Sequence, residues 1–286
     1  MIDIENQNTV VFYETRNDYF SITYFKIKDV IFSGKSEYQY IDIFDTFHFG
    51  KVFILDGVVQ TVDKFEFMYH EMLVHVGMIS HPNPKKILVI GGGDGGTVRE
   101  VVKHPTVEKV IMCEIDKMVV EVAKKYLPNL SSKLDDPRVE LKYTDGSKFV
   151  KSFTNEFDLI IVDSTDPDKC KGGMLFTTEF FKDCYTALKE DGILVAQSES
   201  PIYDPDWVKL TYERVKKSFP ITKLYGALCT QYPSGYWTYT IGSKKIDPEK
   251  EIHAERIKQL ENLRYYSEEI HRSSFALPPF IKELLS

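Results

Sequence analysis

The sequence predicts an α/β fold in which a small N-terminal antiparallel β domain precedes a doubly wound, mostly parallel sheet. Residues 10–62 are rich in Val, Ile, Phe, Tyr and Thr, and turn-like stretches such as "SGKS" and "LDG" interrupt them, which is typical of short antiparallel strands. From residue 87 onward, apolar strand-like runs alternate with helical patterns, which favours parallel β-α-β units. We therefore place an N-terminal β-strand domain at residues 1–62 and a catalytic domain at 63–286.

The bulk composition excludes several classes of protein. The 286 residues include 43% hydrophobic and 28% charged side chains, and 36 basic against 43 acidic residues give a net charge of -7. No basic block is present, which argues against a nucleic-acid or anionic-membrane surface. The net negative charge is compatible with a cationic small ligand, but a mildly acidic surface is also common in proteins where it contributes only to solubility.

Cysteine usage and the N-terminal stretch predict a cytoplasmic location. The start, "MIDIENQNTVVFYE", lacks a basic segment followed by an apolar one, and no apolar run is long enough to span a membrane. The four cysteines form no CxxC pair, which indicates free thiols in a reducing compartment: Cys113, Cys170, Cys184 and Cys229. We predict no metal site, because His70 and His75 are five residues apart rather than the four that would put both on one helical face.

In residues 63–286 the spacing of hydrophobic residues predicts the individual helices and strands. The stretch "DKFEFMYHEMLVHVGMIS" is helical, with Tyr69, Met72, Leu73 and Val76 on one face. The expected strands that follow are, in order, residues 86–91, 108–115, 138–143, 157–163, 192–197, 222–229 and 235–243, the last two as an antiparallel pair. The expected helices between them are residues 96–104, 116–127, 146–153, 177–191 and 205–219.

The first of these strands ends in a glycine-rich loop, "GGGDGG". Gly91, Gly93 and Gly96 satisfy G-x-G-x-x-G between a strand and a helix, a pattern typical of a Rossmann-like nucleotide site. Glu114 ends the second strand, 23 residues after Gly91 (114 minus 91), where its carboxylate can accept hydrogen bonds from ribose hydroxyls. The pattern alone does not separate a dinucleotide enzyme from one that uses S-adenosylmethionine.

Acidic residues end the strands of this sheet, and each has two interpretations. Asp94, inside the glycine loop, would repel a pyrophosphate but suits a cationic nucleoside such as a sulfonium that carries an amine. It could instead only cap the next helix. Asp145 could accept from an adenine amino group, with Gly146 allowing close approach, or could likewise be a helix cap.

Asp163 and Asp166 follow the strand over 157–163, which in such sheets lies beside the first strand. Together with Asp94, Glu114 and Asp145, Asp163 would lie in one crevice. Carboxylates gathered in this way repel one another unless a cation or a hydroxyl-rich ligand lies between them.

The motifs resemble those of the spermidine synthases, the polyamine aminopropyltransferase family. They occur in family order over nearly the whole chain: "YQ" at 38–39, "LDGVVQ" at 55–60, "YHEM" at 69–72, "GGGDGG" at 91–96, "CEID" at 113–116, "TDG" at 144–146, "DSTDP" at 163–167, "ALKEDG" at 187–192 and "YPSG" at 232–235. The resemblance implies a Rossmann-like sheet of the S-adenosylmethionine methyltransferase type. It also implies transfer of a 3-aminopropyl group from decarboxylated S-adenosylmethionine to an amine, usually putrescine, giving spermidine and methylthioadenosine without metal or cofactor.

The resemblance also implies roles for individual residues. Asp163 would be the proton acceptor. The methylthioadenosine part of the donor would be held by Gln39, Glu114, Asp145 and Gly146, and its aminopropyl ammonium by Asp94. The amine acceptor would lie among Gln60, Tyr69, His70, Asp94, Asp163, Asp166 and Tyr232. Members of the family form dimers or tetramers, so a homodimer or homotetramer is expected.

One loop departs from the family pattern. After "DSTDP" the family often continues with a glycine-proline pair, whereas this chain has "DKCKGG". We expect residues 164–176 to act as a lid that orders over the bound nucleoside. For His70, an alternative role as a packed helix histidine stays open.

The motifs leave several alternatives to aminopropyl transfer to putrescine. The same chemistry could act on cadaverine, agmatine or spermidine. An amine N-methyltransferase or a nicotinamide dehydrogenase is disfavoured by Asp94, which would face the carboxylate of intact S-adenosylmethionine or a pyrophosphate. A non-catalytic nucleoside-binding protein is disfavoured because Asp163 and Asp166 are both present.

Overall fold

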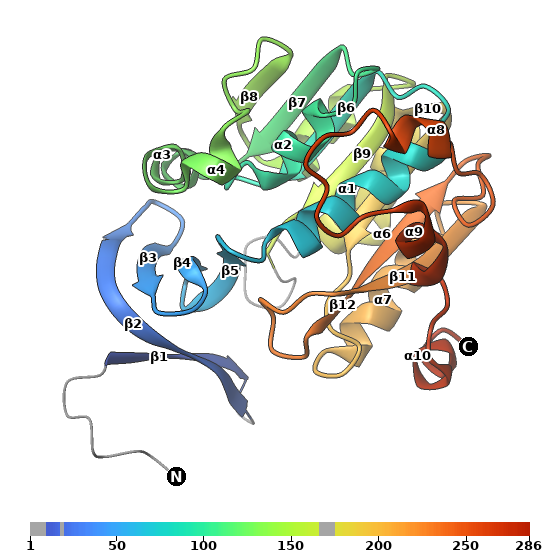
Figure 1. Ribbon diagram of the computed structural model, residues 1–286. Helices are drawn as coiled ribbons and strands as arrows, with labels where there is room; N and C mark the ends of the chain where they lie inside the picture. The colour runs from blue at the N-terminus through green and yellow to red at the C-terminus, as the bar shows by residue number, and fades with distance from the viewer. Residues whose placement is uncertain (1–9, 18–19, 166–174) are drawn as a thin grey trace.

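The chain folds around two sheets that lie side by side (Figure 1). The computed structural model describes residues 10–17, 20–165 and 175–286. The first sheet has five antiparallel strands in the order β1-β2-β3-β4-β5, and the second has seven strands in the order β11-β12-β10-β9-β6-β7-β8. The predicted fold class is confirmed. The domain boundary after residue 62 stays a prediction.

The first sheet is a meander of neighbouring strands. Its members are β1 (Val10–Asn17), β2 (Phe20–Lys35), β3 (Tyr40–Thr46), β4 (Gly50–Leu55) and β5 (Val58–Val62). Between β4 and β5, Asp56 and Gly57 both have positive φ, 46° and 79°, the backbone that a two-residue type I′ hairpin requires. Ile41, Ile43 and Phe53 of this sheet pack against α3 (Lys117–Tyr126) and α4 (Pro128–Ser131), which joins the two sheets.

The second sheet is parallel in its centre and antiparallel at one edge. Its strands are β6 (Lys86–Gly91), β7 (Lys109–Glu114), β8 (Val139–Tyr143), β9 (Phe157–Asp163), β10 (Leu188–Gln197), β11 (Ile221–Leu228) and β12 (Tyr236–Ser243). As predicted, β9 lies beside β6, with Gly91 paired to Asp163. The central strands are apolar on both faces because helices cover both. Ile87 and Val89 of β6 enter one core cluster, and Leu88 and Ile90 enter the other.

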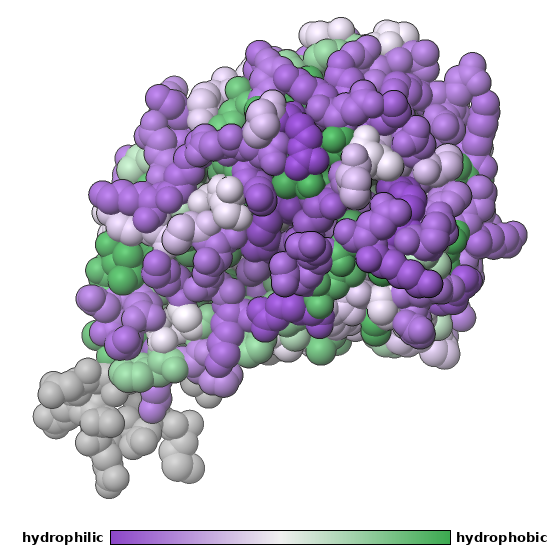
Figure 2. All heavy atoms as spheres, turned by 45° about the horizontal axis from the view of Figure 1, so that its top comes forward, coloured by the Kyte–Doolittle hydropathy of each residue, from purple (hydrophilic) through white to green (hydrophobic). Residues whose placement is uncertain are grey.

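The helices form the two outer layers around the second sheet. The remaining ones are α1 (Phe67–Ser80), α2 (Gly96–Val102), α5 (Gly146–Phe149), the 3₁₀ turn η1 (Val150–Ser152), α6 (Thr178–Ala187), α7 (Pro205–Lys216), α8 (Ala254–Ile257), α9 (Glu268–Ser274) and α10 (Pro279–Leu284). No helix of the described residues is both long and apolar enough to cross a membrane. The face shown in Figure 2 is mainly hydrophilic, with hydrophobic side chains in small groups.

One element prediction was wrong, and one helix is more buried than its pattern indicated. The helix expected over 177–191 ends at Ala187, because Leu188 pairs with Phe157 of β9 and the strand then passes through an irregularity before Ile193. Helix α1 is not buried on one face only: every residue except Met68 is buried. The C-terminal segment covers its other side (Figure 1), and Glu71 accepts hydrogen bonds from the backbone N–H groups of residues 264–266.

Candidate active site

A cavity of about 340 Å³ lies beyond the carboxyl ends of the parallel strands, bordered by side chains from both sheets. Ligands of doubly wound sheets bind at this edge. All the predicted site residues that the structure describes line this cavity: Gln39, Gln60, Tyr69, His70, Asp94, Glu114, Asp145, Gly146, Asp163 and Tyr232. Asp166 and most of the predicted lid lie outside the described residues.

The glycine-rich loop holds the end of β9 in place. Gly91 and Gly92 have φ values of 83° and 71°, and a Cβ added to Gly91 would lie 2.1 Å from the carbonyl oxygen of Asp163. The Gly92 N–H donates to that same oxygen at 2.7 Å. Glycine is therefore required at position 91 because the backbone of the glycine loop lies directly against the backbone of β9. This contact fixes the position of the Asp163 backbone, from which its side chain extends.

The Asp163 carboxylate is half-buried and held by two hydroxyl groups. Tyr69 donates to Oδ1 at 2.8 Å, and Thr97 donates to Oδ2 at 2.6 Å. Burial, together with the nearby charge of Asp94, raises the pKa of Asp163 above its ordinary value, against the opposing effects of His70 and the two hydroxyls. Burial also raises the pKa of Tyr69 well above its ordinary value, so its O–H stays a donor. A fixed carboxylate with a raised pKa is suited to accept a proton.

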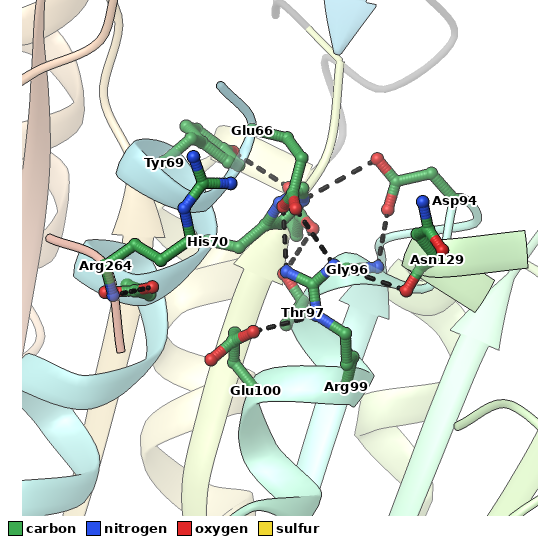
Figure 3. Close-up of polar contacts among 12 residues, drawn as sticks. Glu66, Tyr69, His70, Asp94, Gly96, Thr97, Arg99, Glu100, Asn129 and Arg264 are labelled. Atoms are coloured by element: carbon green, nitrogen blue, oxygen red, sulfur yellow. Dashed lines mark hydrogen bonds and ion pairs between the residues drawn. The ribbon is translucent and has the colours of Figure 1, made fainter. Parts of the chain in front are cut away.

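Asp94 has a different environment in the same cavity (Figure 3). Its Oδ1 accepts from the Gly96 N–H at 2.8 Å, the first N–H of α2, although the N-cap residue itself is Gly95. Its Oδ2 lies 3.6 Å from Nε2 of His70. Burial acts to raise the pKa of Asp94, but the cationic His70 and the Gly96 hydrogen bond outweigh it and lower the pKa. The two carboxylates of the cavity therefore differ, because the pKa of Asp94 is lowered and that of Asp163 is raised.

The ring of His70 is the reason for glycine at position 96. A Cβ there would lie 2.4 Å from Cε1 of His70. Alanine normally favours a helix by up to about 1 kcal/mol over glycine. We nevertheless expect Gly96→Ala to destabilise the protein by about 1–3 kcal/mol, as overpacking does. In a His70→Ala background the same change should be neutral or stabilising. Denaturant unfolding of the unmodified protein, the two single variants and the double variant measures the coupling free energy between the two positions. An equal loss of unfolding free energy from Gly96→Ala in both backgrounds would contradict the contact with His70.

The side of the cavity beside β7 and β8 carries Glu114 and Asp145. Oε1 of Glu114 accepts from the Asp116 N–H at 2.9 Å, and burial raises its pKa to about 7. Oδ1 of Asp145 accepts from both the N–H and the hydroxyl of Ser147, so this residue also caps its helix. Gly146 is required because a Cβ there would lie 2.4 Å from Cγ2 of Ile90.

Gln39 reaches this side from the first sheet. Its Nε2 donates to Oδ2 of Asp116 at 3.1 Å, and Ser36 donates to the same oxygen at 2.5 Å. Asp116 also caps α3 by accepting from the Met118 N–H. Asp116 belongs to the "CEID" motif, yet nothing in its local pattern indicated that it holds Gln39.

The other end of the cavity is aromatic. Tyr232 lies edge-on to Tyr69, with ring centroids 5.7 Å apart, and 4.1 Å from the ring of Trp237. Its hydroxyl donates to the Gln60 carbonyl at 2.9 Å. Gln197 also lines the cavity and donates to the Ser164 carbonyl at 3.0 Å. Its position at the carboxyl end of β10 could have indicated it, whereas no local signal pointed to Trp237.

Among the described residues, one cluster has the composition of a metal site: His81, Asp158 and Asp191. The Asp158 carboxylate and Nδ1 of His81 already have other partners. Asp158 accepts from the Lys85 and Lys86 N–H groups and from Nζ of Lys189. Nδ1 of His81 accepts from the Asn83 N–H, which leaves the proton of a neutral ring on Nε2, the atom nearest Asp191. These contacts favour a structural role. The absence of a metal from the reaction stays a prediction.

Comparison with known proteins gives consistent matches over most of the chain. Residues 66–253 match the family model of the spermine/spermidine synthase domain, and residues 10–63 match that of the spermidine synthase tetramerisation domain. A protein named polyamine aminopropyltransferase from Thermotoga petrophila is 55% identical over 263 residues, which is 92% of this chain and 89% of that protein. One of the same name from Clostridium kluyveri is 50% identical over 260 residues, 91% of this chain and 94% of that protein.

Solved structures agree with the sequence matches. A spermidine synthase in complex with the transition state analogue AdoDATO superposes with a TM-score of 0.95 at 51% identity, covering 98% of this chain and 96% of that one. The spermidine synthase from Thermotoga maritima gives a TM-score of 0.93 at 51% identity, covering 97% and 94%.

Proposed function

The chain belongs to the spermidine synthase family, and we propose that it transfers a 3-aminopropyl group from decarboxylated S-adenosylmethionine to putrescine. The products are spermidine and methylthioadenosine. Aminopropyl transfer to an amine is the activity of the family, and the chain is a transferase of this type. The identities of donor and acceptor are the proposal.

The observation that carries the proposal is the contrast between two carboxylates in one cavity. Asp94 has a lowered pKa beside His70, and Asp163 has a raised pKa between Tyr69 and Thr97. Titratable pairs whose environments push their pKa values apart are typical of a division of roles. Asp94 is suited to bind an ammonium that stays protonated during the reaction, and Asp163 is suited to accept a proton.

These roles fit the demands of the reaction. A sulfonium is already an activated electrophile, but an alkylamine has a pKa of about 10 and is protonated at neutral pH. Asp163 accepts a proton from the amine, directly or through water, while Tyr69 orients the nitrogen. The nitrogen lone pair then forms the N–C bond as the C–S bond breaks, and its electron pair leaves on sulfur as the neutral thioether of methylthioadenosine. The fixed alignment of the two substrates supplies further acceleration.

The nucleoside is assigned to the side of the cavity that carries Gln39, Glu114, Asp145 and Gly146. Glu114 accepts from the ribose hydroxyls, and Asp145 from the adenine amino group through the oxygen that Ser147 does not occupy. Gln39 is held by Asp116 in a position to contribute. The sulfonium carries the reactive carbon and its own leaving group, so we propose that no cofactor takes part.

The acceptor is assigned to the aromatic end, bordered by Asp163, Tyr69, His70, Gln60 and Tyr232. We include Asp166 on the strength of the family resemblance alone. A primary diamine fits an apolar wall with carboxylates beside it. Cadaverine, agmatine and spermidine are the alternatives to putrescine.

Two further proposals concern the protein as a whole. The match of residues 10–63 to a tetramerisation domain supports an oligomer, which we propose to be a homodimer or homotetramer. We propose the cytoplasm as its location, from the cysteine pattern of the sequence.

Product analysis tests the proposal. The protein is incubated with decarboxylated or intact S-adenosylmethionine and with each amine, and the products are identified by mass. We expect spermidine and methylthioadenosine from putrescine and the decarboxylated donor. A methylated amine from the intact donor would show an N-methyltransferase, and a larger product from another amine would reassign the acceptor.

The pKa of Glu114 predicts how nucleoside binding depends on pH. Burial raises this pKa to about 7, and ribose hydroxyls donate best to the ionised form. Methylthioadenosine affinity should therefore be constant above about pH 8 and fall by up to about tenfold per unit below pH 7. Calorimetric titration across this range measures it. In the Glu114→Gln variant this dependence should disappear, and an unchanged pH profile there would assign the titration to another group.

A further inference from the structure

A chain of buried charges leads from the cavity into the interface between α1 and α2 (Figure 3). Asp94 faces Nε2 of His70 at 3.6 Å, and Nδ1 of His70 contacts Oε2 of Glu66 at 2.6 Å. Arg99 then donates to both oxygens of Glu66, at 2.9 and 2.8 Å. Asp94 and His70 line the cavity, whereas Glu66 and Arg99 lie behind them, outside its lining.

The geometry around His70 favours a ring that carries protons on both nitrogens: Nδ1 is within hydrogen-bond distance of Glu66, and Nε2 lies at ion-pair distance, 3.6 Å, from Asp94. Each nitrogen faces a carboxylate oxygen, and an ionised carboxylate can only accept hydrogen bonds. A neutral ring would turn a lone pair toward one of the two carboxylates. The ring cannot rotate away from them easily, because it packs edge-on against Tyr69 and directly over Gly96.

Glu66 is equally fixed in its ionised form. Arg99 binds it in the bidentate geometry that matches a carboxylate, and its guanidinium does not lose its proton in proteins. Burial acts to raise the pKa of Glu66, but His70 and Arg99 outweigh it and lower the pKa.

We propose that Glu66, held by Arg99, is a positioning residue that keeps His70 a cation with its Nε2–H turned toward Asp94. The groups that face His70 are Glu66 and Tyr69 on its own side, Asp94 from the glycine loop, Asp163 from β9 and, behind Glu66, Arg99 from α2. With His70 charged, Asp94 stays ionised beside Asp163 before any substrate binds. The consequence for donor binding rests on the proposed function, but the charge state of His70 does not.

The direct test is the titration of His70 by nitrogen NMR in protein labelled at histidine, with the signal assigned from a His70→Gln variant. In the unmodified protein, His70 should stay an imidazolium from about pH 6 to 8, above the range of an ordinary histidine. In Glu66→Gln its pKa should fall by about one to three units, the effect of removing an opposite charge in contact.

A matched control comes from the same helix. Glu71 is as buried as Glu66, but its carboxylate accepts backbone N–H groups of residues 264–266 rather than facing His70. Glu71→Gln should leave the His70 titration unchanged. Glu66→Asp, which keeps the charge, should restore the imidazolium at neutral pH.

Kinetics give a second readout. Glu66→Gln should raise KM for the decarboxylated donor by about tenfold, the effect of one pKa unit, while methylthioadenosine, which has no ammonium, binds as before. A neutral His70 in the unmodified protein at pH 7 would overturn the proposal, and this measurement does not depend on whether a variant folds. An unchanged His70 titration in Glu66→Gln would also overturn it. Lack of aminopropyl transfer with every amine would refute the proposed function alone.

Discussion

Replacing Asp163 with Asn should lower turnover by about 10²- to 10⁴-fold, the usual contribution of a general base. Asn has nearly the same shape but cannot take a proton from the amine, whereas Asp163 is a carboxylate with a pKa raised by burial and by the nearby charge of Asp94. Nucleoside binding should be kept, because Gln39, Glu114 and Asp145 lie on the other side of the cavity. Single-turnover product formation and methylthioadenosine titration measure the two quantities.

A control separates lost basicity from lost positioning. The amide oxygen of Asn can accept from only one of the two hydroxyls that now hold Asp163, so the contact with the other must reverse, with the amide NH2 donating to the hydroxyl oxygen. Thr97→Val removes the bond to Oδ2 and leaves the carboxylate. Thr97→Val should lower turnover by about tenfold at most. A hydrogen bond to a charged group contributes about 1.5–3 kcal/mol to stability, and only part of that free energy affects the turnover rate. If Thr97→Val lowered turnover as much as Asp163→Asn, Asp163 would be a structural group and not the base.

Asp94→Asn should weaken binding of the decarboxylated donor by about 10- to 150-fold, equivalent to about 1.5–3 kcal/mol for a hydrogen bond to a charged group. The oxygen of Asn can still accept from the Gly96 N–H, so the start of α2 is preserved. What is lost is the negative charge that faces the cavity and His70.

Methylthioadenosine is the matched ligand for this variant, because it shares the nucleoside and lacks the aminopropyl ammonium. Its affinity should change by less than about threefold, within the range of a near-neutral substitution. Calorimetric titration of both ligands gives the comparison. Equal losses for the two would mean that Asp94 acts only as a helix cap and that another group binds the ammonium.

Local patterns in the sequence were sufficient for the order of the elements and for the edge at which the acids gather. The alternation of apolar runs and helical periods predicted the parallel sheet, and β9 lies beside β6 as expected. The carboxyl ends of parallel strands meet at one edge, so the strand-end acids Asp94, Glu114, Asp145 and Asp163 could be placed in one cavity before the structure was known. Helix capping by Asp94 and Asp145 was also foreseeable, because it involves residues only two apart.

Side-chain partners far apart in the chain could not be predicted in this way. Thr97 bonds to Asp163 across 66 residues, and Gln39 to Asp116 across 77. The bidentate pair of Glu66 and Arg99 likewise depends on how α1 packs against α2. None of these contacts produces a periodic pattern of hydrophobic and polar residues in the sequence.

The sequence by itself therefore determined the α/β class and the strand edge that carries the site, and with the family resemblance it placed ten of the residues that line the cavity. Only the tertiary structure decided which carboxylate has a lowered pKa and which has the raised pKa that suits a base. Asp94 and Asp163 are the same residue type at neighbouring strand ends, and they differ because one lies beside His70 and the other between Tyr69 and Thr97. A pKa depends on burial and on charges within a few ångströms, and those neighbours come from elements that meet only when the chain has folded.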